Sequence, residues 1–62
     1  MTNAQAQAYA VVALRNIQRN GADFYEVGKA CQALDREIYD LMDIMFEEEA
    51  EEKAGRILEG RG

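Results

Sequence analysis

The stretch FYEVGKACQALDREIYDLMDIM, residues 24–45, decides the fold. Its apolar residues recur alternately three and four positions apart, which is the a/d heptad pattern of a helix that buries one narrow face against other helices. We call this face the seam, and its members are Phe24, Val27, Cys31, Leu34, Ile38, Leu41 and Met45. The pattern predicts a helix over residues 24–45 whose seam forms the core and the interface with other helices.

Length and composition favour one all-helical domain that associates with another chain. The sequence has 62 residues and no proline. A chain of this size buries only about 60% of its unfolded surface, so it usually needs a disulfide, a metal or a partner. One cysteine and no histidine exclude an internal disulfide and leave a zinc site incomplete. We therefore expect a homo-oligomer, most simply a dimer, and no cofactor.

The acidic residues are unevenly distributed along the chain. The net charge is −5, and all acids lie from Asp23 onward, whereas residues 1–22 contain only Arg15 and Arg19 as charged side chains. This charge disfavours direct binding to nucleic acid or to an anionic membrane, and it favours a basic partner. The longest apolar run, residues 9–14, is far shorter than the roughly 20 residues of a membrane span. We expect a soluble, cytoplasmic protein.

Residues 3–20 are expected to form the first helix. Thr2 or Asn3 can cap its first turn. Arg15 and Arg19 lie one turn apart on the face opposite its apolar stripe, and they offer only a small basic surface. The stripe is rich in alanine and comprises Ala6, Tyr9, Ala10, Ala13, Leu14 and Ile17, of which Ala10, Leu14 and Ile17 are expected to pack on the seam.

A short turn should join the first two helices as an antiparallel hairpin. Asn20 and Gly21 can end the first helix in a left-handed conformation. Asp23 can cap the next helix, and Glu26 three residues later would complete a capping box. Gly28 then either lets the first helix approach closely or is simply tolerated near a helix start.

The heptad register ends at Met45. Continuing it would place Glu48 and Glu52 on the seam, which a dry interface does not allow. The later apolar residues point to a different side of the helix, and they are Phe46, Ala50, Ala54, Ile57 and Leu58. Either the chain breaks near residues 45–47 and a third helix runs over residues 47–59, or one long helix meets a second neighbour. We favour the break.

No set of residues indicates catalysis. The chain has no histidine, and 62 helical residues form a poor pocket. Cys31 lies on the seam without a basic neighbour one turn away, so we expect a buried structural thiol. The acidic run at residues 47–52 lacks the histidines of helical di-iron sites and the glycine-kinked loop of calcium sites.

Two groups of residues are candidates for a partner surface. Tyr39, Met42 and Phe46 form a second apolar strip beside the seam, which fits either a third helix or a partner protein. Acidic side chains follow this strip in the sequence, namely Glu47, Glu48, Glu51 and Glu52. They indicate a solvated helix face or, as an alternative, a docking surface for a basic groove.

Two segments carry a resemblance to other proteins. The opening MTNAQAQAYAVVAL, residues 1–14, and the later EEEAEEKAGRI, residues 47–57, are similar to short uncharacterised helical proteins of Firmicutes phages and mobile elements. In those proteins a Thr or Ser tends to cap the acidic helix, whereas this chain has Phe46. The resemblance implies a small accessory protein and names no activity.

These observations predict an all-α protein, an antiparallel helical hairpin with a third C-terminal helix, that assembles into an oligomeric bundle. We expect a non-enzymatic, protein-binding or self-associating module. The alternative is an acidic inhibitor of a nucleic-acid-binding host enzyme, in which residues 47–52 occupy the enzyme's basic groove.

Overall fold

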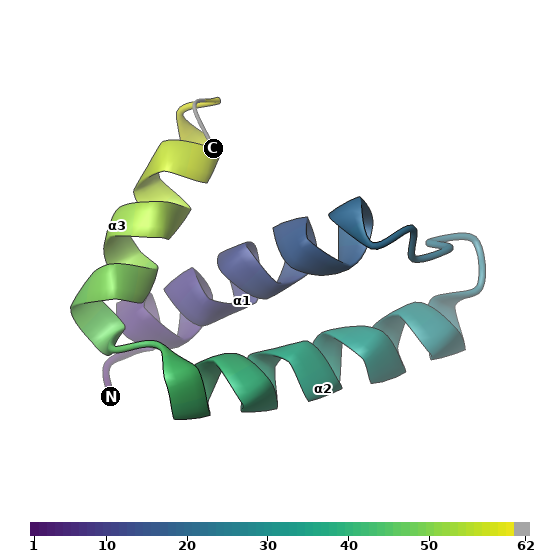
Figure 1. Cartoon of the computed structure of the whole chain (residues 1–62), viewed down its shortest axis with the longest axis horizontal. Helices are drawn as coiled ribbons and strands as arrows, with labels where there is room; N and C mark the ends of the chain where they lie inside the picture. Colours follow the sequence, from purple (N-terminus) through teal and green to yellow (C-terminus); the bar gives the residue numbers. More distant parts are fainter. Residues whose placement is uncertain (61–62) are drawn as a thin grey trace.

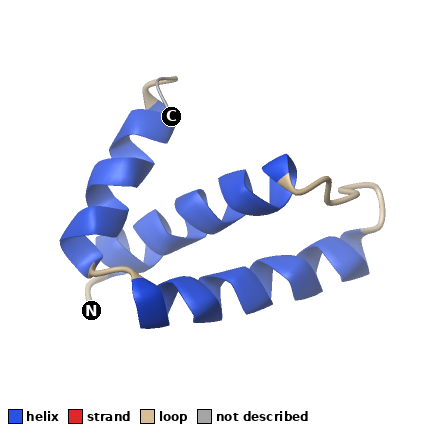
Figure 2. Ribbon diagram, in the orientation of Figure 1, coloured by secondary structure: helices blue, strands red, loops and turns tan. Residues whose placement is uncertain are grey.

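The computed structural model describes residues 1–60 and contains three α-helices. They are α1 (Asn3–Arg19), α2 (Val27–Ile44) and α3 (Glu47–Leu58), and the described residues contain no strand (Figure 2). Figure 1 shows α1 and α2 side by side as a hairpin, while α3 leaves the end of α2 and crosses α1. The predictions of an all-α chain and of a third helix are confirmed.

Both ends of α1 follow their capping signals. The Thr2 hydroxyl accepts a hydrogen bond from the Gln5 amide, and the Gln5 side chain accepts one from the Thr2 amide, which completes a capping box. At the other end, Gly21 adopts a φ of 85°. The amides of Gly21 and Ala22 donate to the carbonyls of Gln18 and Ile17, so α1 ends in a Schellman motif.

The second helix begins later than the sequence predicts. The Asp23 carboxylate accepts a hydrogen bond from the Tyr25 amide at 2.9 Å and thereby stabilises a turn. Glu26 occupies the N-cap of α2 without a side-chain capping bond, so the expected Asp23–Glu26 capping box is wrong. Phe24 therefore lies in the connecting turn rather than in the helix.

A real break separates α2 from α3. Met45 is extended, with φ −132° and ψ 129°, and Phe46 is the extended N-cap of α3. The Tyr9 hydroxyl donates a hydrogen bond of 2.5 Å to the Met45 carbonyl, which a continuous helix would have used internally. This bond from α1 satisfies the carbonyl at the corner, and the single-helix alternative is wrong.

The core is built around α1 rather than around the seam. Both α2 and α3 pack on α1, and these two helices do not pack on each other. The buried apolar residues are Ala8, Tyr9, Val12, Ala13 and Ile17 of α1, Leu41 of α2, and Ala50 and Ala54 of α3. The α1 helix therefore buries residues against two helices on different sides, instead of the single buried stripe that the sequence predicts. Leu14, which was expected in the core, is exposed.

Gly28 does not serve a close approach between helices. A Cβ atom added at this position would meet no other atom within 4 Å. Of the two interpretations that the sequence allows, the structure has the tolerated glycine near a helix start.

Candidate interaction surfaces

The two halves of the seam have different environments. Leu41 is buried, and Leu34, Ile38 and Met45 pack partly buried against the core. The N-terminal half of the seam remains exposed and consists of Phe24, Val27 and Cys31. The expected burial of the Cys31 thiol is therefore wrong for the single chain, because α1 covers only the C-terminal half of the seam. The seam as an interface between chains stays a prediction.

Phe24 helps to form an apolar groove between α1 and α3. The groove has a volume of about 480 Å³. Leu14 is 48% exposed and Leu58 is 75% exposed in this groove. Its walls are Val11, Leu14, Phe24, Ile57 and Leu58, together with Arg15 and Gln18. We call this surface the α1–α3 groove, and Arg15 is the only charged residue that lines it.

A shallower hollow continues along the same side of α1 and α3. It shares Val11 and Leu58 with the α1–α3 groove and extends toward the start of α1, where Gln7 is exposed. Small side chains line most of this hollow, and Glu51 is the one acid among its lining residues.

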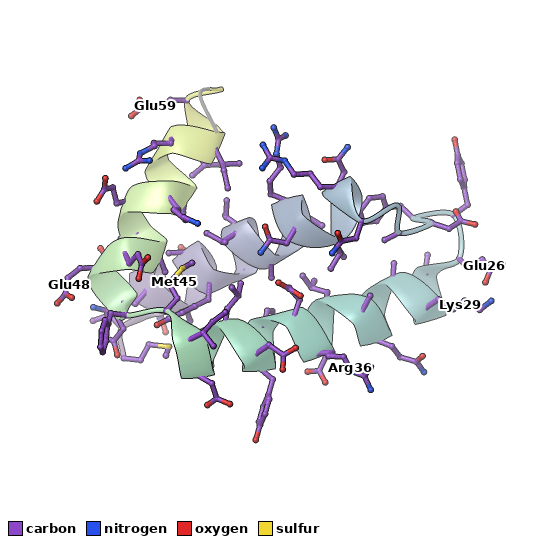
Figure 3. All side chains as sticks on the ribbon, viewed as in Figure 1. Glu26, Lys29, Arg36, Met45, Glu48 and Glu59 are labelled. Atoms are coloured by element: carbon purple, nitrogen blue, oxygen red, sulfur yellow. The ribbon has the colours of Figure 1, made fainter. Side chains whose placement is uncertain are left out.

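The predicted second apolar strip is exposed in the single chain. Tyr39 is 71% and Phe46 is 81% exposed, and Met42 is also exposed. Met42 and Phe46 come together with Glu47 and Glu48 around a hollow at the α2–α3 corner, but Tyr39 does not line it. Figure 3 shows Met45 at this corner and Glu48 on the outer side of α3.

The electrostatics of the corner concentrate on Tyr9. Burial raises the pKa of the Tyr9 phenol above its ordinary value of 10.0, and the carboxylates of Glu47, Glu48 and Glu49 raise it further. The neutral phenol is therefore favoured, and it is the form that donates to the Met45 carbonyl.

A second hollow adjoins the α1–α3 groove and shares Arg15 and Ile57 with it. Four basic side chains line a small hollow of about 130 Å³, namely Arg15, Arg19, Lys53 and Arg56. We call this the basic hollow. The sequence pattern places Arg15 and Arg19 on one face of α1 and offers Lys53 and Arg56 only as i,i+4 partners of Glu49 and Glu52, because it does not give the direction of α3. The signal that could have found it is the i,i+3 spacing of Lys53 and Arg56 beside the alanines of α3.

The acidic run does not act as a unit. Glu48, Glu51 and Glu52 are exposed, whereas Glu47 is half-buried. Glu52 forms an ion pair with Arg56 one turn later. Within residues 1–60, no three His, Cys, Asp or Glu side chains gather in a way that could hold a metal ion.

Comparisons with known proteins do not assign the chain to a family. Over the described residues, no helix has both the length and the apolar character that a membrane crossing requires. The phage and mobile-element resemblance stays a prediction. No family model matches the sequence, and no curated protein or solved structure matches it either.

Proposed function

We propose that this chain is a non-enzymatic, self-associating helical module whose copies pair through the α1–α3 groove. The observation that carries the proposal is the groove itself, in which exposed apolar side chains from α1, α3 and the α1–α2 turn meet. Contiguous apolar surface of this kind marks protein interaction sites.

The surface area of the chain supports a partner. A folded monomer of 7.0 kDa is expected to expose about 4,000 Å². This chain exposes 4674 Å², and the excess is close to the roughly 800 Å² that each partner buries in a stable interface. The core is also poor in large side chains, since four of its eight buried members are alanines.

The charge distribution selects the face. Two copies of charge −5 repel each other, and the repulsion is weakest where the facing surfaces lack acids. The α1–α3 groove has no acid among its lining residues. The α2–α3 corner, in contrast, has Glu47 and Glu48 beside its apolar residues. A second copy is therefore better accommodated at the groove than at the corner.

The open arrangement of helices points the same way. In a closed three-helix bundle each helix packs on both others, whereas here α2 and α3 pack only on α1. The N-terminal half of the seam, with Val27 at 67% exposure, is likewise left uncovered. A second copy that covers the groove would also cover Phe24, the first residue of the seam, and so reduce the exposed part of the seam.

Sedimentation equilibrium over about 5–500 µM tests the proposal. The wild-type mass should rise from that of one chain, 7.0 kDa, toward that of two chains as the concentration increases. Leu58→Gln should raise the dissociation constant at least about tenfold, because it removes a central apolar contact.

Ile44→Gln is the matched control. Ile44 is 78% exposed on α2 and does not line the groove. Its replacement by glutamine therefore removes as much exposed apolar surface as the replacement of Leu58, but away from the proposed interface. It should change the dissociation constant by less than about twofold. A wild-type chain that keeps the mass of one subunit at 500 µM contradicts the proposal, as does an equal loss in both variants.

The alternative function, an acidic inhibitor of a nucleic-acid-binding enzyme, stays a prediction. It requires the exposed carboxylates of Glu48, Glu51 and Glu52 to enter a basic groove on another protein. Binding to such a protein should weaken steeply between about 0.05 and 0.5 M salt. Capture that survives replacement of these three glutamates by glutamine would exclude it.

A further inference from the structure

The hollow at the α2–α3 corner combines apolar and acidic side chains on a surface that is separate from the α1–α3 groove. It has a volume of about 350 Å³. Its lining residues are Tyr9, Met42, Met45, Phe46, Glu47 and Glu48. None of them lines the groove, so a ligand of this hollow does not compete with the pairing of two chains. We call it the corner hollow.

Phe46 contributes little to the fold of the single chain. It occupies the N-cap of α3, where Ser, Thr, Asp or Asn would bond to a free amide of the first turn, and it makes no side-chain capping bond. Its 81% exposure means that it adds no burial to the core either. Since aromatic side chains are enriched at protein interfaces, contact with another molecule explains Phe46 better than folding does.

The charge around the corner hollow selects a basic occupant. Eight of the twelve acids lie within residues 37–52, and this stretch contains no Lys or Arg. Along α3, no basic residue lies one helical turn from Glu47 or Glu48. Burial raises the pKa of Tyr9, and the carboxylates of Glu47, Glu48 and Glu49 raise it further, which indicates a negative potential at the hollow. A nucleic acid, an anionic membrane or a second copy of this acidic chain would be repelled here.

The backbone of the corner favours a helix over an extended peptide. The described residues contain no strand, so they offer no sheet edge with which an extended peptide could pair. The Met45 carbonyl already accepts a hydrogen bond from the Tyr9 hydroxyl. A helix satisfies its backbone groups internally and needs only side-chain contacts. The flexible side chain of Met42 can adapt to such contacts.

We propose that the corner hollow binds a basic amphipathic helix of another protein. An apolar residue of that helix packs on Met42 and Phe46, and Lys or Arg residues beside it pair with Glu47 and Glu48. A small cation would leave the ring of Phe46 uncovered, and a purely apolar ligand would leave the two carboxylates without a partner. This binding site goes beyond the proposed self-association and does not depend on it.

Three synthetic helical peptides of about 20 residues test the proposal on the full chain. The basic peptide has leucines at positions i, i+3, i+4 and i+7 and lysines beside them. The second peptide has glutamates in place of the lysines, and the third has the composition of the first with its leucines spread around the helix. Fluorescence anisotropy at about 0.1 M salt should give a dissociation constant for the basic peptide at least about tenfold below those of the other two.

Phe46→Ser separates binding from folding. Serine is a better N-cap than phenylalanine, so the variant should keep or raise the melting temperature of the wild type. It should nevertheless weaken binding of the basic peptide at least about tenfold, because the apolar anchor is lost. Tyr25→Ser is the matched control, since it replaces an exposed aromatic residue outside the helices at the other end of α2. It should bind the peptide within about twofold of wild type.

A pair of glutamine variants tests the charge. Glu47→Gln/Glu48→Gln should weaken binding of the basic peptide at least about fivefold and reduce its dependence on salt. Glu51→Gln/Glu52→Gln removes the same charge from the same helix at residues that do not line the hollow. This control should change the dissociation constant by less than about twofold.

NMR amide shifts then locate the bound peptide. Shifts at Phe46 and Glu48 support the corner hollow, whereas shifts confined to Leu14 and Leu58 would place the peptide in the α1–α3 groove and overturn the proposal. Equal affinity for the basic peptide and the peptide with spread leucines would overturn it, as would equal losses in the two glutamine variants or no binding at about 1 mM. A chain that pairs with itself but does not bind the peptide contradicts only this inference, and the reverse result contradicts only the proposed function.

Discussion

The two contacts that α1 makes differ in the size of the side chains they bury. The α1–α3 contact buries Ala50 and Ala54 of α3, while α2 buries only Leu41 in its contact with α1. The larger seam residues Leu34 and Ile38 are merely half-covered. The α1–α2 contact also includes a hydrogen bond of 3.0 Å from the Asn16 amide group to the Glu37 carboxylate.

The difference shows that the most hydrophobic face need not be the best-buried one. Small residues let two helices approach until backbone and Cβ atoms pack, so little surface remains open. Large residues at the edge of a two-helix contact need a third surface to cover them, and α3 lies elsewhere. The strong heptad pattern of α2 is consequently left half-exposed in the single chain.

The largest expected effect comes from removing the one buried side chain of α2. Leu41→Ala should lower the free energy of unfolding by about 3 kcal/mol, from lost burial plus a cavity. A chain of this length has only about 3–9 kcal/mol in total. Val27→Ala, at the exposed end of the same seam, should lower it by less than about 1 kcal/mol. Urea unfolding followed by circular dichroism measures both, and equal losses would mean that the seam is buried uniformly.

Overpacking tests the α1–α3 contact. Ala50 is 0% exposed, so Ala50→Leu should destabilise the chain by about 1–3 kcal/mol. Ala6→Leu adds the same atoms to an exposed position of α1 and should change stability by less than about 0.5 kcal/mol. If Ala50→Leu were as stable as wild type in the same urea experiment, close packing of α3 on α1 would be refuted.

Tyr9 joins the two contacts and makes stability depend on alkaline pH. Its pKa is raised in the folded chain above 10.0, the ordinary value, so above pH 10 the folded state keeps a proton that the unfolded state has lost. The contribution of Tyr9 to the free energy of unfolding is therefore complete below pH 10, and it declines as the pH rises through the folded-state pKa.

Tyr9→Phe should reduce this decline between pH 9 and 11. It should also lower the melting temperature at pH 7 by about 4–8 °C, because the Met45 carbonyl loses its donor. Tyr25→Phe is the control, since that side chain is 99% exposed. Equal melting temperatures of the two variants would show that the Tyr9 hydroxyl does not stabilise the corner between α2 and α3.

The smallest effect is expected at the start of α2. Gly28→Ala should stabilise the chain by about 0.5–1 kcal/mol, because the new methyl group meets open space and alanine favours the helix. A loss of stability in the urea experiment would show instead that α1 approaches this glycine.

The sequence predicts much of the helical framework because its signals are local. The Thr2 cap, the Gly21 helix end and the loss of apolar register after Met45 each depend on neighbouring residues alone. The start of α2 is predicted too early because Asp23 can accept a hydrogen bond either from the Tyr25 amide, in a turn, or from the third amide of a helix, and these two arrangements compete.

The placement of α3 could not be predicted, and both candidate sites depend on it. The groove needs Leu58 beside Leu14, and the basic hollow needs Lys53 beside Arg15, although each pair is separated by more than 30 residues in the sequence. The Tyr9–Met45 hydrogen bond, which fixes the corner between α2 and α3, leaves no periodic signal either. The seam predicted a core and an interface with other helices, but not that an apolar groove would lie between α1 and α3.

Intermolecular paramagnetic broadening tests the central claim, that copies pair through the α1–α3 groove. A spin label is placed by Gln7→Cys in a Cys31→Ser background, because Gln7 is exposed beside the groove without lining it. Labelled chains without ¹⁵N are mixed equally with unlabelled ¹⁵N chains. Broadening is expected at the amides of Val11, Leu14 and Leu58 in the ¹⁵N copies. Broadening confined to the outer face of α2, or none at 500 µM, would contradict it.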